Sequence, residues 1–430
     1  MCYAIPGKVA AINNRMVTVD YFGEKKRAIN DLQELSIGDY IYAQGGYVIS
    51  KISATEAKKI LSTWKELFFK LQELDRKSAH FIPVSNRTVS IYNKVNKGFS
   101  PTGEDLRYLL GLKDKAELEI FFKAANALRQ KYHKNSCCVH GIIEISNYCR
   151  RGCHYCGISR LNTKLKRYRM SKDEILTAVK DAVEKYGFKA LVLQSGEDDG
   201  YTLDTLIDIV KTIKQRYAVL IFISFGEIGK VGLEELYRVG ARGLLMRFET
   251  SNRGIYRKLH PGSSLENRLE EIRFARHLGY LIVTGGLIGL PGQSRDDIIN
   301  DVLLAKELKA EMFSFGPFLP HPNTPLANNP APCEEDVLKT LALVRFVAPK
   351  EAKILVTTGF ETLSAAARQK GLVSGASSVM LNATPLKYRN LYSIYPQRAH
   401  EKEKIEFQIK EAIALLKSLG RAPTDLGTGD

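Results

Sequence analysis

The sequence lacks any apolar run of about 18 residues or more, so no segment predicts a helix that crosses a membrane. Its first eight residues, Met1–Lys8, contain neither the basic stretch nor the long apolar core of a signal peptide. Cysteine is scarce, with seven residues in 430, and three of the seven lie close together. These absences argue against a disulfide scaffold and predict a cytoplasmic protein without a membrane partner.

Carboxylates are too few to balance the basic side chains. The chain has 63 Lys and Arg against 47 Asp and Glu, a net charge of +16, and its densest basic stretch covers residues 164–169. Such a balance can indicate nucleic acid or an anionic substrate. Because no nucleic-acid-binding motif accompanies the basic stretch, we interpret it as solvated surface with a few arginines near a substrate, and we expect no nucleic-acid partner.

Three cysteines, Cys149, Cys153 and Cys156, have the most informative spacing in the chain, Cys-x3-Cys-x2-Cys. Thiolates are the ligands of iron–sulfur clusters, and most [4Fe–4S] clusters take four of them. Three close cysteines without a fourth would leave one iron open to a small molecule. A zinc site is the alternative, since His154 could serve as its fourth ligand.

The run from Glu144 to Gly157 resembles the signature of the radical S-adenosylmethionine (SAM) enzymes, and Tyr155 before the third cysteine also fits that pattern. The resemblance implies a [4Fe–4S] cluster on the three cysteines, with SAM at the open iron. An electron from the cluster would cleave SAM to a 5′-deoxyadenosyl radical, and a donor such as ferredoxin or flavodoxin would supply that electron. No cysteine follows Cys333, so we predict a single cluster.

The first 53 residues alternate short apolar runs with turn residues such as Pro6-Gly7 and Gly45-Gly46. This pattern predicts a small all-β barrel of the OB or SH3 kind. Apolar residues at helical spacing predict a helix from Ala54 to about Leu74. We therefore assign residues 1–74 to a first domain.

The opening Met1-Cys2-Tyr3-Ala4-Ile5-Pro6-Gly7 resembles the HypC/HupF family of hydrogenase-maturation chaperones. In that family the exposed cysteine, here Cys2, holds an iron with cyanide and carbonyl ligands. The resemblance therefore implies that Cys2 binds an iron species. Gln44 stands where the family usually has a histidine, which departs from the pattern. The alternative is that this barrel is only a docking module and Cys2 a spare thiol.

From residue 139 onward, strand-length apolar runs alternate with amphipathic stretches of helical length. Eight such repeats predict an α/β fold, a (βα)8 TIM-type barrel over 139–430 that includes a C-terminal helix near 404–419. A polar linker (75–102) and a helical lead-in (103–138) should precede it. The last residues, 421–430, read as frayed. The expected strands are Gly141–Ser146, Ala190–Gln194, Val219–Ser224, Gly243–Met246, Leu281–Thr284, Met312–Phe315, Lys353–Thr357 and Ser378–Met380.

Functional groups of a parallel barrel lie at the C-terminal ends of its strands. Here those ends contain carboxylates and an arginine, which suit a zwitterionic ligand. The radical SAM resemblance implies SAM-binding roles for Tyr155, Ser195, Gly196, Glu197, Glu227, Arg247, Glu249, Gly289 and Leu290. The alternatives are a structural Glu227–Arg247 ion pair and ordinary glycine turns. Phe248 stands where we would expect a histidine.

Separate stretches, among them 166–170, 193–198, 289–293, 316–326 and 388–396, resemble HydE, a maturase family of [FeFe]-hydrogenase, over about residues 88–425. The resemblance implies a small iron substrate with carbonyl, cyanide and cysteine ligands, and other hydrogenase-maturation proteins as partners. Anion sites in the barrel cavity would suit Thr357, Thr358, Tyr388 and Arg389.

Two alternatives stay open beside the HydE interpretation. One is a radical rearrangement of an amino acid, as in methylornithine synthase, because a cavity arginine and threonines could hold an amino acid as well as an anion. The other is a non-catalytic scaffold that carries a cofactor precursor and never cleaves SAM.

Overall fold

A small closed β-barrel forms the first part of the computed structural model, which describes residues 5–31, 34–81 and 86–424. Its five strands have the order β1-β2-β3-β5-β4, and β1 pairs with β4 to close it. Alternate side chains of β2, Val17, Val19 and Tyr21, fill the interior. The predicted small barrel is confirmed. The strands are β1 (Gly7–Asn13), β2 (Met16–Tyr21), β3 (Glu24–Ile29), β4 (Tyr40–Gln44) and β5 (Tyr47–Ile52).

Helix α1 (Ala54–Ser78) begins where Ser53 Oγ accepts a hydrogen bond from the Glu56 amide. It packs Trp64, Phe68 and Leu71 against the small barrel. The helix extends past the predicted end at Leu74, because its last turn buries Asp75 in a bidentate ion pair with Arg129, at 2.8 Å for both bonds. This pair joins the first domain to the rest of the chain.

The segment 75–102 is not the structureless linker that the sequence predicts. It contains α2 (Arg87–Asn96), which Asn86 caps by accepting a hydrogen bond from the Val89 amide. Ile91 and Val95 of this helix belong to the main hydrophobic core, and the surrounding polar residues hide that apolar face in the sequence. The predicted lead-in helices are present as α3 (Gly103–Gly111) and α4 (Lys115–His133).

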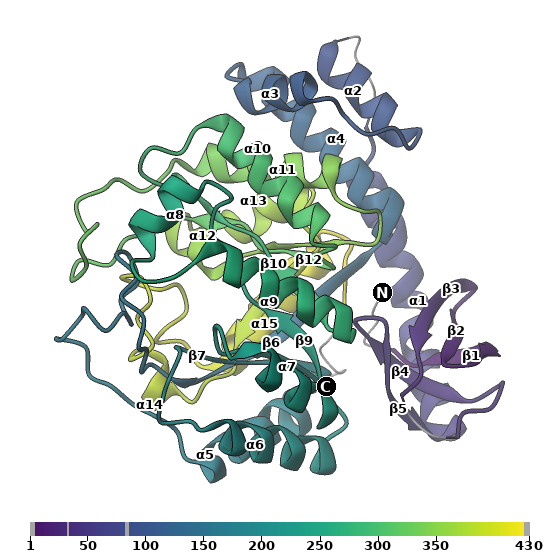
Figure 1. Cartoon of the computed structure of the whole chain (residues 1–430). Coiled ribbons are helices and arrows are strands. Elements are labelled where there is room, and N and C mark those ends of the chain that lie inside the picture. Colours follow the sequence, from purple (N-terminus) through teal and green to yellow (C-terminus); the bar gives the residue numbers. More distant parts are fainter. Residues whose placement is uncertain (1–4, 32–33, 82–85, 425–430) are drawn as a thin grey trace.

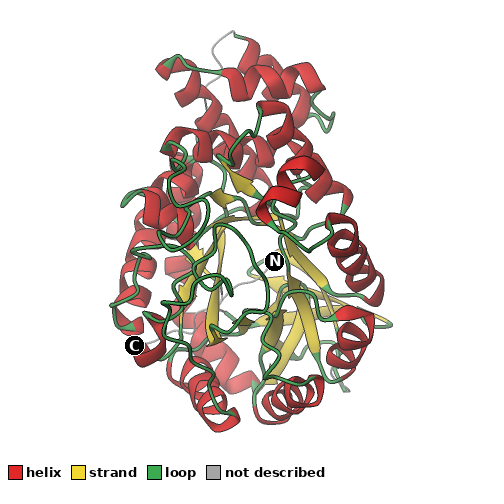
Figure 2. Ribbon diagram, turned by 60° about the vertical axis from the view of Figure 1, so that its left-hand side comes forward, coloured by secondary structure: helices red, strands yellow, loops and turns green. Residues whose placement is uncertain are grey.

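Eight parallel strands close into a second, larger barrel, because β15 pairs with β6 from Ser378↔Cys138 to Asn382↔Ile142. Figure 2 shows these strands as a ring with helices outside and loops across the near opening. The predicted TIM-type barrel is therefore confirmed. The strands are β6 (Ser136–Ser146), β7 (Ala190–Ser195), β8 (Leu220–Ser224), β9 (Ala241–Leu245), β10 (Leu281–Thr284), β12 (Met312–Phe313), β14 (Lys353–Val356) and β15 (Ser378–Asn382).

Two boundaries differ from the predicted ones. Strand β6 begins at Ser136 rather than Gly141, so Cys137 and Cys138 are buried inside the strand and the predicted division at 138/139 cuts through it. The chain end is not frayed as far as residue 424, since Arg421 is buried and β16 (Ala422–Pro423) pairs with β6. Residues 425–430 lie outside the described residues.

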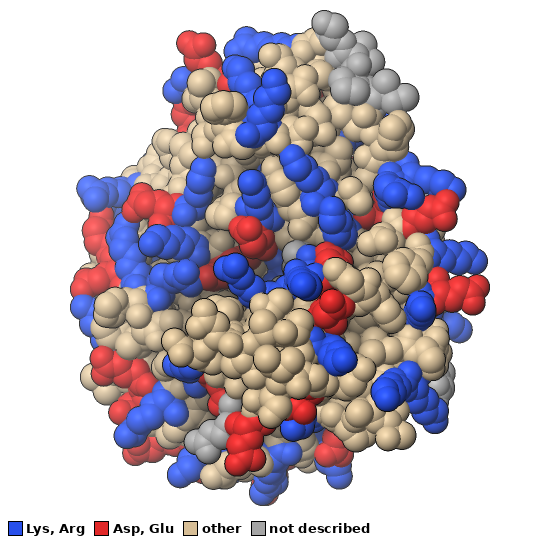
Figure 3. All heavy atoms as spheres, turned by 90° about the vertical axis from the view of Figure 1, so that its right-hand side faces the viewer, with Lys and Arg blue, Asp and Glu red and all other residues tan. Residues whose placement is uncertain are grey.

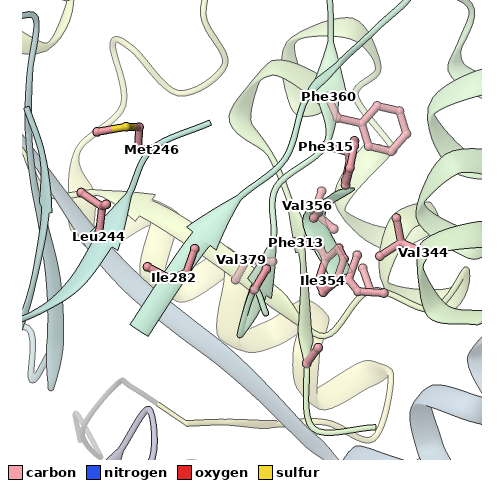
Figure 4. Packing of buried hydrophobic residues seen from close by; sticks show 14 of the residues in the cluster. Leu244, Met246, Ile282, Phe313, Phe315, Val344, Ile354, Val356, Phe360 and Val379 are labelled. Atoms are coloured by element: carbon pink, nitrogen blue, oxygen red, sulfur yellow. The ribbon is translucent and has the colours of Figure 1, made fainter. Parts of the chain in front are cut away.

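Helices cover the outside of the large barrel, and none in the described part of the chain is long and apolar enough to span a bilayer. Figure 4 shows Phe313, Ile354 and Val356 of β12 and β14 packed toward Val344 of α11 and Phe360 of α12. The helices are α5 (Lys172–Lys180, followed by a π turn), α6 (Leu203–Arg216), α7 (Gly229–Arg238), α8 (Arg253–Leu259), α9 (Leu265–Leu278), α10 (Arg295–Glu307), α11 (Glu334–Val347), α12 (Thr358–Leu363), α13 (Ala367–Val373), α14 (Leu386–Arg389) and α15 (Ile405–Ser418).

The small barrel covers the N-terminal mouth of the large one. Its turn between β4 and β5 reaches the first residues of two large-barrel strands, because a Cβ on Gly45 would lie 2.8 Å from Leu220 and 3.1 Å from Leu281. The Tyr47 hydroxyl donates to the Gly279 carbonyl at 3.2 Å. An apolar cluster continues from this contact into the barrel interior, and its buried members are Tyr47, Ile49, Ala190, Val192, Leu220, Phe222, Val283, Met312 and Leu355.

Candidate active site at the carboxyl ends of the strands

The loop after β6 contains the three cysteines and is held in place by partly buried hydrogen bonds. The Arg167 guanidinium donates to the carbonyls of Asn147, Ile158 and Ser159 at 2.5–2.8 Å. The Asn147 side chain in turn donates to the Leu391 carbonyl at 2.7 Å. A side chain at Gly157 would meet the Ser393 carbonyl, so the loop also packs closely on the segment that follows α14.

The three thiols line one wall of a cavity of about 290 Å³ at the C-terminal ends of the strands. Burial is the largest cause of their raised pKa values, and it raises the pKa of Cys156 to about 12. A bound metal is therefore what would hold them as thiolates. His260 Nδ1 lies 3.1 Å from the Cys153 sulfur, and the structure adds this histidine to the site.

The spacing of the sulfurs favours a cluster over zinc. Among the described residues, His400, Glu403 and Glu411 form a group of three whose ligand atoms lie within 4.8 Å of one another, and the three cysteines form no such group. Ligands of one tetrahedral zinc with Zn–S bonds of 2.3 Å would lie about 3.8 Å apart. A cluster distributes its ligands over separate irons and suits the wider spacing. His154 is not among the cavity-lining residues.

The end of β7 touches the cysteine loop at Gly196. A Cβ at this position would lie 2.2 Å from the Tyr148 carbonyl oxygen and 2.6 Å from Cys149 Cβ, so only glycine permits the contact. The neighbouring Ser195 and Glu197 also line the cavity. The sequence prediction thus identified three residues that the fold brings against the cysteines, and their binding of SAM stays a prediction.

Glu197 lies at the centre of a charged network beside the cysteines. Its carboxylate accepts hydrogen bonds from Arg150 and Arg151 and from the Glu227 amide. Gly226 makes room for it, since a Cβ there would lie 2.3 Å from Glu197 Cγ and the backbone has φ of +73°. The Glu197 side chain is therefore fixed from both sides.

Glu227 is held by two arginines, and its binding of SAM stays a prediction. Its carboxylate accepts from Arg268 at 2.8 and 2.9 Å and from Arg151 at 3.0 Å. It lines a neighbouring recess of about 520 Å³ outside the cysteine cavity. The sequence analysis named Arg247 as the alternative ion-pair partner of Glu227, whereas the structure pairs Glu227 with Arg268 and Arg151.

Arg247 and Glu249 follow β9 and both line the cavity. They form an ion pair, with Arg247 Nη2 3.3 Å from Glu249 Oε2. Glu249 adopts φ of +69°, which costs on the order of 1–3 kcal/mol for a residue other than glycine. The intervening Phe248 is fully buried in the main core, so the histidine expected there would not have faced the ligand.

Gly289 and Leu290 lie behind the cavity wall. Gly289 has φ of +83° and packs on Pro332, where a Cβ would lie 2.6 Å from the ring. Leu290 belongs to a buried apolar cluster with Phe318, and Tyr155 packs against this cluster while lining the cavity. Leu290 therefore supports Tyr155, and neither Gly289 nor Leu290 is in the lining.

The predicted anion-binding residues separate into two groups. Thr357 and Thr358 line the cavity at the end of β14. Tyr388 and Arg389 lie elsewhere, which corrects the prediction for them. The Arg389 guanidinium is buried on the carbonyls of Thr384 and Glu403, and the Tyr388 hydroxyl donates to Glu174 at 2.6 Å.

Sequence reasoning missed a buried ion pair in the cavity, between Glu144 of β6 and Arg398 of the loop after α14. Both side chains are almost fully buried, and Arg398 also donates to the Tyr392 carbonyl. The Nε atom of Arg398 has no hydrogen-bond partner in the described part of the chain. The only sequence signal was the neighbouring stretch 388–396. Cys2, the remaining predicted residue, lies outside the described residues.

Family models match the two barrels separately. The Radical SAM superfamily model matches residues 143–305, and the HupF/HypC family model matches residues 1–64. The [FeFe] hydrogenase maturase subunit HydE of Thermotoga maritima is 41% identical over 322 residues, which cover 75% of this chain and 92% of that protein. The chain belongs to the HydE family of radical SAM enzymes.

Other members of the superfamily are also similar to this HydE-family chain. The 3-methylornithine synthase of Methanosarcina acetivorans is 31% identical, covering 60% of this chain and 73% of that protein. The crystal structure of methylornithine synthase (PylB) superposes with a TM-score of 0.67 at 26% identity, over 77% of this chain and 97% of that one. The maturase HydG from Carboxydothermus hydrogenoformans, at 20% identity, has a TM-score of 0.68 over 86% and 85% of the two chains and shares the fold.

Radical SAM enzymes use a [4Fe–4S] cluster and SAM, and the cavity of this HydE-family protein fits both. The cluster supplies the electron that cleaves SAM. Cys149, Cys153 and Cys156 would hold the cluster, because their sulfurs line one wall without a fourth described cysteine beside them. Glu249, whose Oε2 pairs with Arg247 at 3.3 Å, lines the same cavity, so this pair offers a carboxylate and a guanidinium that suit the ammonium and carboxylate groups of SAM.

Proposed function

We propose that this radical SAM enzyme acts in hydrogenase active-site assembly, on a small iron complex with carbonyl, cyanide and cysteine ligands. The observation that carries the proposal is the fusion in one chain of a HydE-family barrel and a domain matching the HupF/HypC model. Each half points to hydrogenase maturation independently of the other. The proposal takes its substrate class from the HydE resemblance.

The cavity has the mixed lining that such a complex needs. Its floor is apolar, built from Ile142, Leu245, Leu355 and Met380, and would accept uncharged carbonyl ligands. The hydroxyl-bearing Thr357 and Thr358 lie at one side and would donate to cyanide or carboxylate oxygen. Arg398 also lines the cavity, and its guanidinium forms an ion pair with Glu144 there.

The proposal assigns Cys2 to binding or delivering the iron species. The small barrel lies at the opposite mouth of the large barrel from the cysteine loop, as Figure 1 shows with the former at the right and the latter at the left. The apolar layer between them fills the barrel interior. A species bound by the small barrel would therefore pass to the cavity through solvent or a partner protein, and not along the barrel axis.

The decisive experiment measures 5′-deoxyadenosine release by the anaerobically reconstituted, reduced enzyme, with and without a synthetic iron–carbonyl–cyanide–cysteine complex. We expect the complex to stimulate release strongly, and the Thr357→Val variant to lose stimulation while keeping slow basal release. An equal rate of 5′-deoxyadenosine release with and without the complex would refute this substrate class. The carrier role is tested apart, since Cys2→Ala should mature hydrogenase poorly in cells but respond to the added complex normally.

A second candidate reaction is the radical rearrangement of an amino acid. The 31% identity to 3-methylornithine synthase favours it, as does a cavity that contains both carboxylates and guanidinium groups. Incubation with lysine and SAM, followed by mass spectrometry for 3-methylornithine, tests it directly. Formation of that product would select this reaction over the iron substrate.

A further inference from the structure

We propose that the outer face of the cysteine loop is the docking surface for a small acidic one-electron carrier protein of the flavodoxin type. The face consists of Tyr148, Arg150, Arg160, Leu161, Lys164 and Lys166, which are all exposed. The inference rests on the radical SAM reaction assigned above, whose cluster needs an electron from outside the chain. The step moves one electron from the carrier to the cluster and forms or breaks no bond.

The cysteine-loop face lies directly over the cluster ligands. Tyr148 and Arg150 flank Cys149 in the chain. A Cβ on Gly152, next to Cys153, would lie 3.5 Å from Arg160 Nε and 3.9 Å from Leu161 Cδ1, so these two side chains cover the loop from outside. A carrier seated here would be separated from the ligand sulfurs by little more than the loop itself.

The charge of this face is basic because its nearby acids are already paired. Asp198 pairs with Arg169, and Glu197 and Asp199 pair with Arg150. No carboxylate of the described residues forms an ion pair with Arg160, Lys164 or Lys166, which leaves three uncompensated cations. These three cations attract an acidic partner and speed its association.

The face also contains two exposed apolar side chains. Tyr148 is 40% exposed and Leu161 is 43% exposed. The Arg169 guanidinium stands over the Tyr148 ring at 4.6 Å and holds it outward. A few apolar side chains among cations without ion-pair partners are what a weak, short-lived redox contact needs.

A carrier bound at the cysteine-loop face would not block the cavity. SAM and substrate enter the cavity inside the barrel, whereas this face is the outer surface of the loop. Figure 1 shows the segment that leads into α5 along the left edge, away from the small barrel. The side with the small barrel, shown in Figure 3, has Lys and Arg side chains spread among Asp and Glu, and provides a control surface.

Charge reversal tests the proposal. The variant Arg160→Glu, Lys164→Glu, Lys166→Glu lowers the net charge from +16 to +10, since each change removes two charges. The control variant Lys58→Glu, Lys59→Glu, Lys65→Glu makes the same change at exposed positions of α1. Each reconstituted protein is assayed for SAM cleavage with reduced flavodoxin and, separately, with dithionite.

With flavodoxin at low salt, we expect the loop variant to cleave SAM at least about tenfold more slowly than wild type. At high salt its rate should approach that of wild type, and with dithionite the two rates should be equal. Flavodoxin binding measured by calorimetry should weaken in parallel, without any need for turnover. Unchanged flavodoxin kinetics, or an equal effect of the control variant, would overturn the docking surface. A loss with dithionite as well would assign these side chains to the cluster site, which also overturns it. Absence of SAM cleavage by wild type with dithionite would instead refute the radical SAM reaction.

Discussion

The Nε2 atoms of Gln44 and His140 lie 3.5 Å apart, each on a side chain only 1% exposed. Gln44 ends β4 of the small barrel, and His140 lies in β6 of the large one. Gln44 occupies the position where HypC/HupF proteins usually have a histidine. In this chain that position forms part of the interface between the two barrels, and an imidazole faces it from the other barrel.

The pH dependence of stability should reveal His140. Burial lowers its pKa to about 3, against about 6.5 in an unfolded chain. The unfolded state therefore binds more protons between these values, and the free energy of unfolding falls as the pH is lowered from 6.5 toward 3. At pH 5 this effect of His140 lowers the free energy of unfolding by about 2 kcal/mol.

Replacing His140 by Gln removes this group. Chemical denaturation should show a smaller loss of stability from pH 7 to pH 5 in His140→Gln than in wild type. An identical loss in the two proteins would mean that His140 titrates normally. His133 and His260, whose pKa values burial also lowers, stay in both proteins and cancel in the comparison.

Gly226→Ala should impair SAM binding through Glu197. The new Cβ would lie 2.3 Å from Glu197 Cγ, so the carboxylate must move. We expect SAM affinity to fall by about tenfold or more, equal to roughly 1.4 kcal/mol, with iron content unchanged. Gly229→Ala is the matched control, because Gly229 has a similar φ of +76° and no atom within 4 Å of its added Cβ. Equal effects of both substitutions would assign the loss to backbone strain alone.

Metal analysis should find one cluster per chain. Reconstituted wild type should contain about four irons and four sulfides, and loss of Cys149, Cys153 or Cys156 should remove most of them. Cys333→Ala is the control, since Cys333 is exposed and hydrogen-bonds Asp336 at 3.0 Å. Roughly eight irons would reveal a second cluster, and stoichiometric zinc would refute the cluster altogether.

The Glu144–Arg398 pair should be costly to break from one side. Arg398→Met leaves the Glu144 carboxylate buried without its cation, and we expect a loss of about 3–5 kcal/mol in the free energy of unfolding. The double variant Glu144→Gln, Arg398→Met should recover most of it. Arg107→Met, which breaks an exposed pair with Asp296, should cost under about 1 kcal/mol. A double variant no more stable than Arg398→Met would mean that Arg398 stabilises the fold through contacts other than Glu144.

The strands of the large barrel were predictable because parallel strands buried on both faces are continuous apolar runs. Helix α2 was not, because its apolar face comprises only a few residues within a polar segment. The start of β6 was missed for a similar reason, since Ser136 and His140 interrupt the apolar run although both are buried. Tertiary burial, rather than local pattern, decided these elements.

The cysteines and Ser195-Gly196-Glu197 could be identified because each is a local motif. Arg398 could not, since its partner Glu144 lies 254 residues away and closure of the barrel between β15 and β6 brings the two together. Arg389 was wrongly predicted to bind an anion in the cavity, because the sequence does not show that its guanidinium donates to backbone carbonyls instead.

The closed N-terminal mouth has a consequence for the order of events in the cavity. With the small barrel and the apolar layer closing the other end, everything that reaches the cavity must arrive from the C-terminal side of the large barrel. A substrate that binds further inside the cavity than SAM must then enter before SAM, and its product must leave after the fragments of SAM. The enzyme should therefore follow a compulsory order of binding and release, with substrate first in and product last out.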